Sequence, residues 1–203
     1  MKHRFTNIKG EAFDLTSGSG GRYQSQLERD GYIKELMDPR ATRATMQDPR
    51  IYLKTILGRR YTADLRVRYV HPQEKAFEFK YSWALDKDPG LNELHEKVAV
   101  DMARLGFAFA VQTELDVYTP DFRMRKFAFE HRNLPQAPEC DEIVNHVRCC
   151  HGIRVEQLIK DIAGQGVTAQ LELVPEVWRL VGLHILTVDF DQVLNLRTAL
   201  HCS

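Results

Sequence analysis

Long apolar runs are missing from this sequence. No stretch of the 203 residues approaches the roughly eighteen consecutive apolar positions of a membrane-spanning helix. The opening segment, MKHRFTNIKGEAFD, also lacks the apolar centre of a signal peptide. We therefore expect a cytoplasmic protein without a membrane partner.

Cysteine is scarce, and its spacing is not that of a metal site. The four cysteines all lie in the last third of the chain, at positions 140, 149, 150 and 202, and no C-x₂-C pair occurs. Structural zinc sites usually draw on such pairs, and adjacent cysteines are poorly placed to bind one tetrahedral ion. We expect free thiols in a reducing compartment.

A phosphate-binding loop is also absent. The glycine-rich segment TSGSGG at residues 16–21 does not end in Gly-Lys-Ser or Gly-Lys-Thr, which a nucleotide-cradling loop requires. We expect residues 1–21 to form a flexible leader.

There is no net charge, but the charges are unevenly distributed. Residues 1–60 carry 12 Lys and Arg against 7 Asp and Glu, whereas residues 131–203 carry 6 against 9. If the chain binds nucleic acid, its first third offers the phosphate contacts, and its acidic last third suits a protein partner. The candidate DNA-binding residues are Arg40, Arg43, Arg50, Arg59 and Arg60.

Hydrophobic periodicity predicts an α/β fold. A helix is expected from Ser25, where SQLE has capping-box spacing, to Asp38-Pro39. Strands are expected at 51–57, 60–70 and 77–81, with the last two joined as an antiparallel hairpin. A helix over LNELHEKVAVDMARLG then leads to FAFAV, which is apolar enough to predict a strand inside the sheet.

The C-terminal part has a different pattern. Short helices are expected at about 139–150, 154–163 and 175–183, followed by two strands at HILTVDF and LNLRTAL. Three helices and a two-stranded end are typical of a winged-helix-like domain. The boundary is expected at Pro135–Pro138, which gives domains at 1–134 and 139–203.

Two neighbouring predicted strands carry the residues with the clearest chemistry. Asp64 lies on the first strand, and Glu78 and Lys80 lie on one face of the second. If the hairpin brings Asp64 and Glu78 together, their repulsion favours a divalent cation, and Mg²⁺ prefers such oxygen ligands. Mn²⁺ is an expected substitute. An Asp followed by Glu-x-Lys is typical of phosphodiester-cleaving enzymes, although a water-facing strand with the same residues is an alternative.

Two further acids need separate treatment. Glu28 in the first predicted helix is a candidate third metal ligand, but its spacing from Ser25 also suits a capping box. Asp121 in TPDF follows a proline, as the first acid of the Pro-Asp…(Asp/Glu)-x-Lys signature usually does, whereas Asp64 follows Ala63. No Glu-x-Lys follows Asp121, however. We therefore leave Asp121 out of the predicted site.

The order of these blocks resembles the TnsA-type endonuclease subunit of heteromeric transposons. The resemblance spans roughly residues 22–198. It rests on Ser25-x-x-Glu28, GRRYTADLRV, FEFK, HEKVAVDMARLGFAF, VQTELDV and VPEVWRLVGLHILTVDFDQVLNL. Glu-x-Lys is shared by the whole PD-(D/E)xK nuclease superfamily, whereas GFAFAVQTELD and the WRLVG…VDFDQ ending point to the narrower family. Ala63 departs from the pattern, since the superfamily usually has proline there.

The resemblance implies a restriction-endonuclease-like mixed sheet flanked by helices, with Glu28, Asp64 and Lys80 catalytic and Glu78 as a further metal ligand. It implies a bacterial, DNA-associated protein that cuts the 5′ ends of a transposon. A TnsB-like transposase would cut and join the 3′ ends, and a TnsC-like ATPase would bind the C-terminal domain. A stand-alone nuclease of the superfamily and a non-catalytic scaffold of the same fold are the alternatives. Targeting through a DNA-binding protein or an RNA-guided complex stays open.

Overall fold

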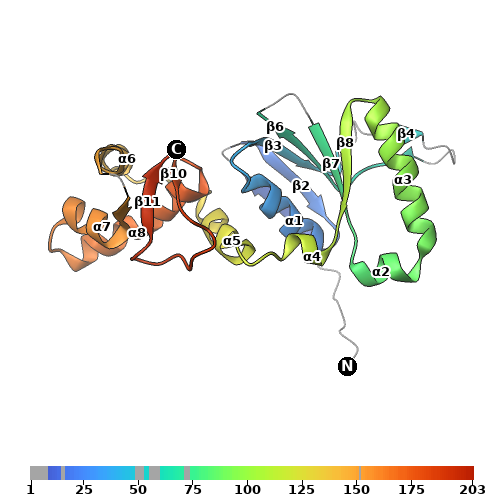
Figure 1. Cartoon of the computed structure of the whole chain (residues 1–203). Helices are drawn as coiled ribbons and strands as arrows, with labels where there is room; N and C mark the ends of the chain where they lie inside the picture. The colour runs from blue at the N-terminus through green and yellow to red at the C-terminus, as the bar shows by residue number, and fades with distance from the viewer. Residues whose placement is uncertain (1–8, 15–16, 49–52, 55–59, 71–73, 151) are drawn as a thin grey trace. The chain divides into compact units, whose positions relative to one another are not determined.

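A computed structural model describes residues 9–14, 17–48, 53–54, 60–70, 74–150 and 152–203. The chain forms two compact units, Met1–Thr119 and Pro120–Ser203. The first unit holds a six-stranded mixed sheet with helices packed against it, which confirms the predicted α/β class (Figure 1). Among the described residues, no helix is long and apolar enough to cross a membrane.

The six-stranded sheet combines parallel and antiparallel neighbours. In spatial order its strands are β1 (Gly10–Asp14), β2 (Ser19–Tyr23), β3 (Ala41–Met46), β6 (Leu65–Tyr69), β7 (Glu74–Phe79) and β8 (Phe107–Gln112). The β2–β3 and β7–β8 pairs are parallel, and the other three pairs are antiparallel. The β6–β7 pairing confirms the predicted hairpin.

Helices cover both faces of this sheet. Helix α1 (Gln26–Leu36) begins at the predicted N-cap, Ser25, and packs against β3, β6 and β7. Helix α3 (Pro89–Arg104) packs against β8 and ends before Gly106, whose φ of 84° forms a left-handed turn (Figure 1). Two short helices complete this unit: α2 (Ser82–Lys87) precedes α3, and α4 (Glu114–Val117) follows β8.

The predicted flexible leader is wrong for the part of it that the structure describes, because β1 and β2 form a hairpin there. Ser19 accepts a hydrogen bond from the Ala44 backbone N–H, which ties β2 to β3. Gly20 and Gly21 have φ values of 149°, and a Cβ atom at either would lie within 3 Å of backbone oxygen in a neighbouring strand. These glycines therefore permit close strand packing.

The predicted continuous strand over residues 60–70 is also wrong. Tyr61 belongs to a separate two-stranded sheet formed by β4 (Leu53–Lys54) and β5 (Arg60–Tyr61), and residues 62–64 are not in a strand. Tyr61 and Ala63 pack in the cluster under α3, together with Ala76, Val98 and Met102. The break therefore places Tyr61 on the α3 face of the sheet. The predicted strand at 51–57 lies largely outside the described residues.

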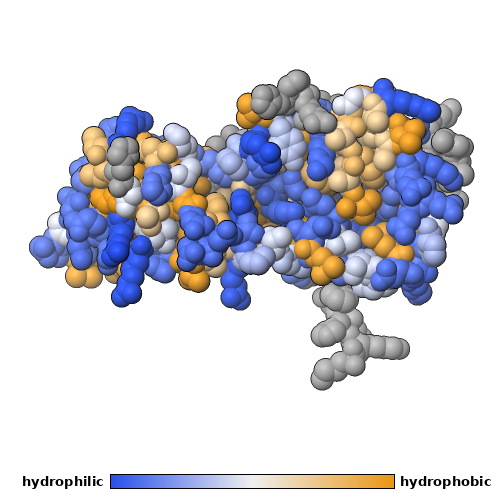
Figure 2. All heavy atoms as spheres, in the orientation of Figure 1, coloured by the Kyte–Doolittle hydropathy of each residue, from blue (hydrophilic) through white to orange (hydrophobic). Residues whose placement is uncertain are grey.

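FAFAV forms β8 as predicted, but this strand is at an edge of the described sheet and not inside it. Its apolar side chains are half-buried, and Figure 2 shows apolar residues gathered over this strand. The α3 helix shields part of β8, which explains why an apolar strand occupies an edge position.

The second unit is mainly helical. It contains α5 (Phe122–His131), α6 (Cys140–Cys149), α7 (Val155–Ala163), α8 (Val167–Gly182) and a small sheet of β10 (Leu186–Thr187), β11 (Ala199–Cys202) and β9 (Ile153–Arg154). The predicted short helices are present, although α8 begins eight residues earlier than expected. All four cysteines are free, as expected.

The division between units falls at Thr119/Pro120, so the expected boundary at Pro135–Pro138 lies inside the second unit. Helix α5 packs against α8 and so belongs to that unit. The Phe127 and Trp178 rings meet edge-on at 5.6 Å, and the Arg132 guanidinium donates a 2.5 Å hydrogen bond to the Gly182 carbonyl. The proline and polar residues after α5 suggested a linker between domains. The contacts of α5 with α8 instead place α5 in the second unit, so the division falls before it.

Candidate active site

Glu78 lies on the α3 face of the central hairpin. The Phe77 and Phe79 rings stack with centroids 6.3 Å apart, and a Cβ atom on Gly31 of α1 would collide with Phe79. These phenylalanines therefore face α1. Because side chains alternate along a strand, Glu78 points to the opposite face, where Ala76 contacts α3 residues. Glu78 is buried, which contradicts the alternative of a water-facing strand.

The hairpin register brings Asp64 next to Glu78. In this antiparallel pair, Leu65 lies opposite Phe77. The residue before Leu65, Asp64, and the residue after Phe77, Glu78, therefore lie opposite each other. The Phe79 backbone N–H donates a 2.9 Å hydrogen bond to Asp64 Oδ2 and holds this carboxylate at the end of β7.

Lys80 lies between these two carboxylates. Its Nζ atom is 2.5 Å from Glu78 Oε1 and 3.8 Å from Asp64 Oδ2. Lys80 directly follows β7, and its backbone N–H donates to the Gln112 carbonyl of β8. The three residues that the sequence singled out therefore form one cluster, at the point where β7 ends.

Burial and mutual repulsion shape the titration of this cluster. Burial, followed by the charges of Glu78 and Glu28, raises the pKa of Asp64 to about 8, although Lys80 and the Phe79 hydrogen bond act against the shift. Burial lowers the pKa of Lys80, but the charges of Asp64 and Glu78 outweigh it, so the net direction is upward. Lys80 thus stays protonated beside the two carboxylates.

Glu28 faces its own helix end. Its Oε1 accepts a 3.0 Å hydrogen bond from the Ser25 hydroxyl, and its Oε2 accepts a 2.8 Å hydrogen bond from the Gln24 backbone N–H. Ser25 caps the helix, because its hydroxyl oxygen accepts a hydrogen bond from the Glu28 backbone N–H. The Glu28 carboxylate bonds the N–H of Gln24 and not that of Ser25, so the full capping box considered from the sequence is not formed. The carboxylate is buried, and its charge acts on both Asp64 and Lys80. Glu28 therefore makes hydrogen bonds at the start of its own helix and also lies within electrostatic reach of the cluster.

Two neighbours of the cluster were missed by the sequence reasoning. The Tyr61 hydroxyl donates a 2.5 Å hydrogen bond to Glu78 Oε2, and burial raises the pKa of this tyrosine. A continuous strand over residues 60–70 would place Tyr61 on the face opposite Asp64, and the break at residues 62–64 is what lets it reach Glu78. His95 of α3 is 6% exposed, and its Nδ1 atom has no hydrogen-bond partner in the described part of the chain. Its spacing from the buried Val98 and Met102 could have identified it.

Burial lowers the pKa of His95, which favours the neutral ring. The opposing charges of Glu78 and Lys80 also act on this histidine, so it lies within electrostatic reach of the cluster. Its ring is 6.2 Å from that of Phe109.

The predicted DNA-binding arginines have different surroundings. Arg40 forms two hydrogen bonds with the Asp38 carboxylate in the turn before β3. Arg43 is exposed on β3. Arg60 contributes its backbone to β5, whereas Arg50 and Arg59 lie outside the described residues.

The donor set at the cluster fits a hard divalent cation. Asp64 and Glu78 supply carboxylate oxygens, and with Glu28 three acidic groups face the single ammonium group of Lys80. Burial is the largest cause of the raised pKa of Asp64, and the negative charges of Glu78 and Glu28 add to it. Mg²⁺ commonly binds through one or two carboxylates and keeps several waters. Within the described ranges, no group of three or more His, Cys, Asp or Glu side chains is arranged to hold a metal ion.

Comparison with known proteins adds no family assignment. No protein-family model matches the chain, and no curated protein matches it. The functional assignment therefore depends on the resemblance in the sequence and on the geometry around Lys80.

Proposed function

We propose that the chain is a Mg²⁺-dependent DNA endonuclease, the subunit of a cut-and-paste transposase that hydrolyses the phosphodiester at the 5′ ends of the transposon. The observation that carries the proposal is the position of Lys80 between Asp64 and Glu78, 3.8 Å and 2.5 Å from their oxygens. Two carboxylates and a lysine in one cluster are the residue types of the PD-(D/E)xK signature, and a metal held by such carboxylates supports phosphodiester hydrolysis.

The fold is compatible with this assignment. The six-stranded sheet with helices on both faces supports a restriction-endonuclease-like first unit. The helices and small sheet of the second unit support a winged-helix-like domain. In the proposed complex, this second unit binds a TnsC-like ATPase, and a TnsB-like transposase processes the 3′ ends.

Each residue of the cluster has a defined part in the proposed reaction. Asp64 and Glu78 would hold Mg²⁺, which when bound stabilises negative charge on the phosphate group. Protonated Lys80 donates hydrogen bonds to the attacking water or to a phosphate oxygen. The Tyr61 hydroxyl fixes the orientation of the Glu78 carboxylate.

A nicking assay with Asp64→Ala and Lys80→Ala tests the proposal. Supercoiled plasmid that carries the transposon ends is incubated with the full-length chain, Mg²⁺ or Mn²⁺, and the partner transposase. Each substitution is expected to reduce nicking by about 10²-fold or more, because each removes a group that contacts the reacting atoms or their metal. Unchanged nicking by either variant would overturn the proposal.

Asp121→Ala is the matched control. Asp121 lies in the TPDF sequence that resembles the written motif, but its carboxylate pairs with Arg125 in α5. Nicking should survive this substitution. The same assay separates the alternatives, since a stand-alone nuclease nicks without the transposase, whereas a scaffold shows no nicking that depends on Asp64.

A further inference from the structure

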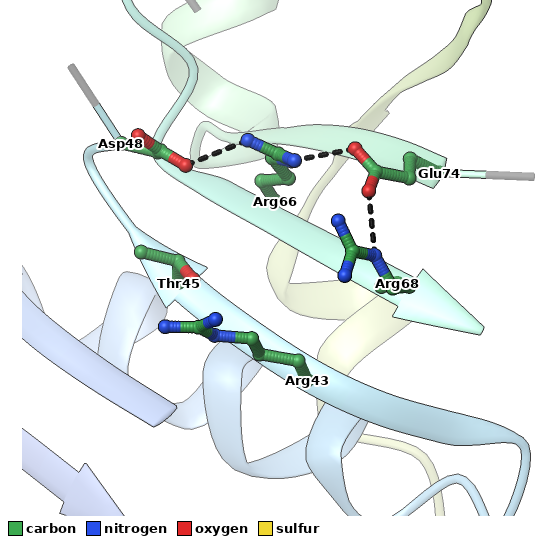
Figure 3. Close-up of a pocket in the computed structure, with 6 residues that line it drawn as sticks. All are labelled: Arg43, Thr45, Asp48, Arg66, Arg68 and Glu74. Carbon is green, nitrogen blue, oxygen red and sulfur yellow. Dashed lines mark hydrogen bonds and ion pairs between the residues drawn. The ribbon is translucent and has the colours of Figure 1, made fainter. Parts of the chain in front are cut away.

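A second polar cluster lies on strands β3, β6 and β7. A small cavity there is lined by Arg43, Thr45, Asp48, Arg66, Arg68 and Glu74 (Figure 3). Its volume of about 30 Å³ is enough for one water-sized group, such as a single phosphate oxygen. Three guanidinium groups face two carboxylates, which leaves one positive charge in excess.

Ion pairs hold two of these arginines in place. Arg66 bridges Asp48 and Glu74, with nitrogen–oxygen distances of 2.8 and 2.7 Å, and Arg68 pairs with the other Glu74 oxygen at 2.7 Å (Figure 3). The Arg66 guanidinium also lies 5.5 Å from the centre of the Phe107 ring. Both arginines are therefore ordered before any ligand binds, which lowers the entropy cost of binding one.

Arg43 supplies the charge that is not neutralised. It pairs with Arg68 in the β3–β6 register, on the same face of the sheet. Neither an ion pair nor a hydrogen bond of its side chain is found among the described residues. Arg68 is also 56% exposed, so its unused N–H groups are accessible. The cluster thus presents several donors in fork geometry to solvent, which suits an oxyanion with more than one oxygen.

The arginine cluster and the carboxylate cluster share one sheet face. Asp64 directly precedes β6, and Arg66 and Arg68 follow it by two and four residues, while Glu74 precedes Glu78 by four on the same side of β7. At about 3.3 Å per residue, the two arginines lie ~7 and ~13 Å along the strand from Asp64. One DNA strand has a phosphate for roughly every 3.4 Å of helix axis, so these distances correspond to about two to four nucleotides.

We infer that Arg43, Arg66 and Arg68 form a phosphate-binding site for the DNA strand that is cut, a few nucleotides from the scissile bond. This inference rests on the proposed nuclease function and adds the path that the substrate takes over the sheet. Asp48 and Glu74 order the arginines and do not contact the phosphate. Because the donors contact phosphate and no base edge, the site sets the position of the strand and reads no sequence.

Duplex binding by full-length chain measures this site without cleavage. Asp64→Asn is used as the background, in EDTA, with two duplexes of unrelated sequence over a range of salt concentrations. Arg43→Ala and Arg68→Ala should each weaken binding about 3- to 10-fold and reduce the slope of log K against log salt by about one. The loss should be equal on both duplexes. Arg148→Ala, which removes an exposed arginine from α6, is the matched control and should leave the slope unchanged.

The inference is wrong if the slopes are unchanged in both variants, if the losses are confined to one duplex, or if the background chain shows no measurable duplex binding. If inorganic phosphate alone displaces the duplex at concentrations similar to those of competing DNA, the cavity is a small-anion site, and the DNA contact is wrong. Thermal unfolding of each variant shows whether its fold is intact. These binding results do not test the proposed nuclease function. That function is tested separately, by the nicking activity of the Asp64→Ala and Lys80→Ala variants.

Discussion

The ammonium group of Lys80 lies 2.5 Å from Oε1 of Glu78, in a position where it also faces Asp64. A lysine between two carboxylates offsets part of their negative charge, which a divalent cation could also offset. If the proposed metal binds here, Lys80 and the metal act on the same negative charge. The stability of the protein should then depend on the metal in a way that substitutions can measure.

Lys80→Ala should destabilise the metal-free protein and increase its response to Mg²⁺. Removing the ammonium leaves Asp64 and Glu78 without a cation, at a cost of about 1–2 kcal/mol, a value reduced because the Lys80 side chain is about a third exposed. Millimolar Mg²⁺ binds the folded state and offsets this loss. Urea unfolding in EDTA and in Mg²⁺ measures both effects.

Lys87→Ala provides the control for Lys80, because it removes the same charge from an exposed position at the end of α2. Its stability should respond to Mg²⁺ as the wild type does. A Lys80→Ala protein that gains no more from Mg²⁺ than the wild type would contradict the idea that lysine and metal share one site.

Stability of the metal-free protein should fall as the pH rises towards 8. The pKa of Asp64 is about 8 in the folded protein and about 4 in an unfolded chain. The folded state therefore binds the proton more tightly, so the stability that this group contributes is fully present below about pH 4 and is lost as the pH rises through 8.

Asp64→Asn removes this titration and keeps an oxygen that accepts the Phe79 hydrogen bond. The variant should be more stable than the wild type at pH 8 by about 1–3 kcal/mol and similar to it near pH 4. Urea unfolding at several pH values in EDTA gives the two curves. Parallel curves would show that Asp64 titrates normally.

Tyr61→Phe tests the hydrogen bond that orients Glu78. Loss of the hydroxyl should cost about 1 kcal/mol of stability and reduce nicking about 10-fold or more, because the carboxylate loses the donor that fixes its orientation. Tyr69→Phe is a matched control, since its hydroxyl donates a 2.6 Å hydrogen bond to Glu35. It should cost similar stability without changing nicking. Equal effects of the two substitutions on nicking would reduce Tyr61 to a structural role.

Local patterns in the sequence were sufficient to predict the centre of this candidate site. Alternation along FEFKY and a short connection predict both the hairpin and the side on which Glu78 lies, because neighbouring strands settle the register. The capping spacing of Ser25 and Glu28 predicts where α1 begins. These features depend on residues close in sequence, where periodicity is informative.

The features that were missed depend on contacts between residues far apart in sequence. Residues 10–14 and 19–23 form β1 and β2 because Ser19 and two glycines allow close packing with neighbouring strands. Hydrophobic periodicity in the sequence does not reveal such contacts. The break before Asp64 depends on pairing between β4 and β5, and it decides where Tyr61 lies. Likewise, the division at Thr119/Pro120 follows from the packing of α5 on α8.

Glu28→Gln and Ser25→Ala separate capping from catalysis. A glutamine at position 28 keeps one side-chain oxygen to accept from Ser25 or Gln24, so its stability cost should be at most about 1 kcal/mol. Ser25→Ala removes the N-cap hydroxyl, costs a similar amount, and leaves the Glu28 charge in place. If Glu28 is a third acid of the site, Glu28→Gln reduces nicking about 10-fold or more, whereas Ser25→Ala retains it. Equal nicking by the two variants at matched stability would assign Glu28 to capping alone, and Asp64 and Glu78 would remain as the two metal ligands.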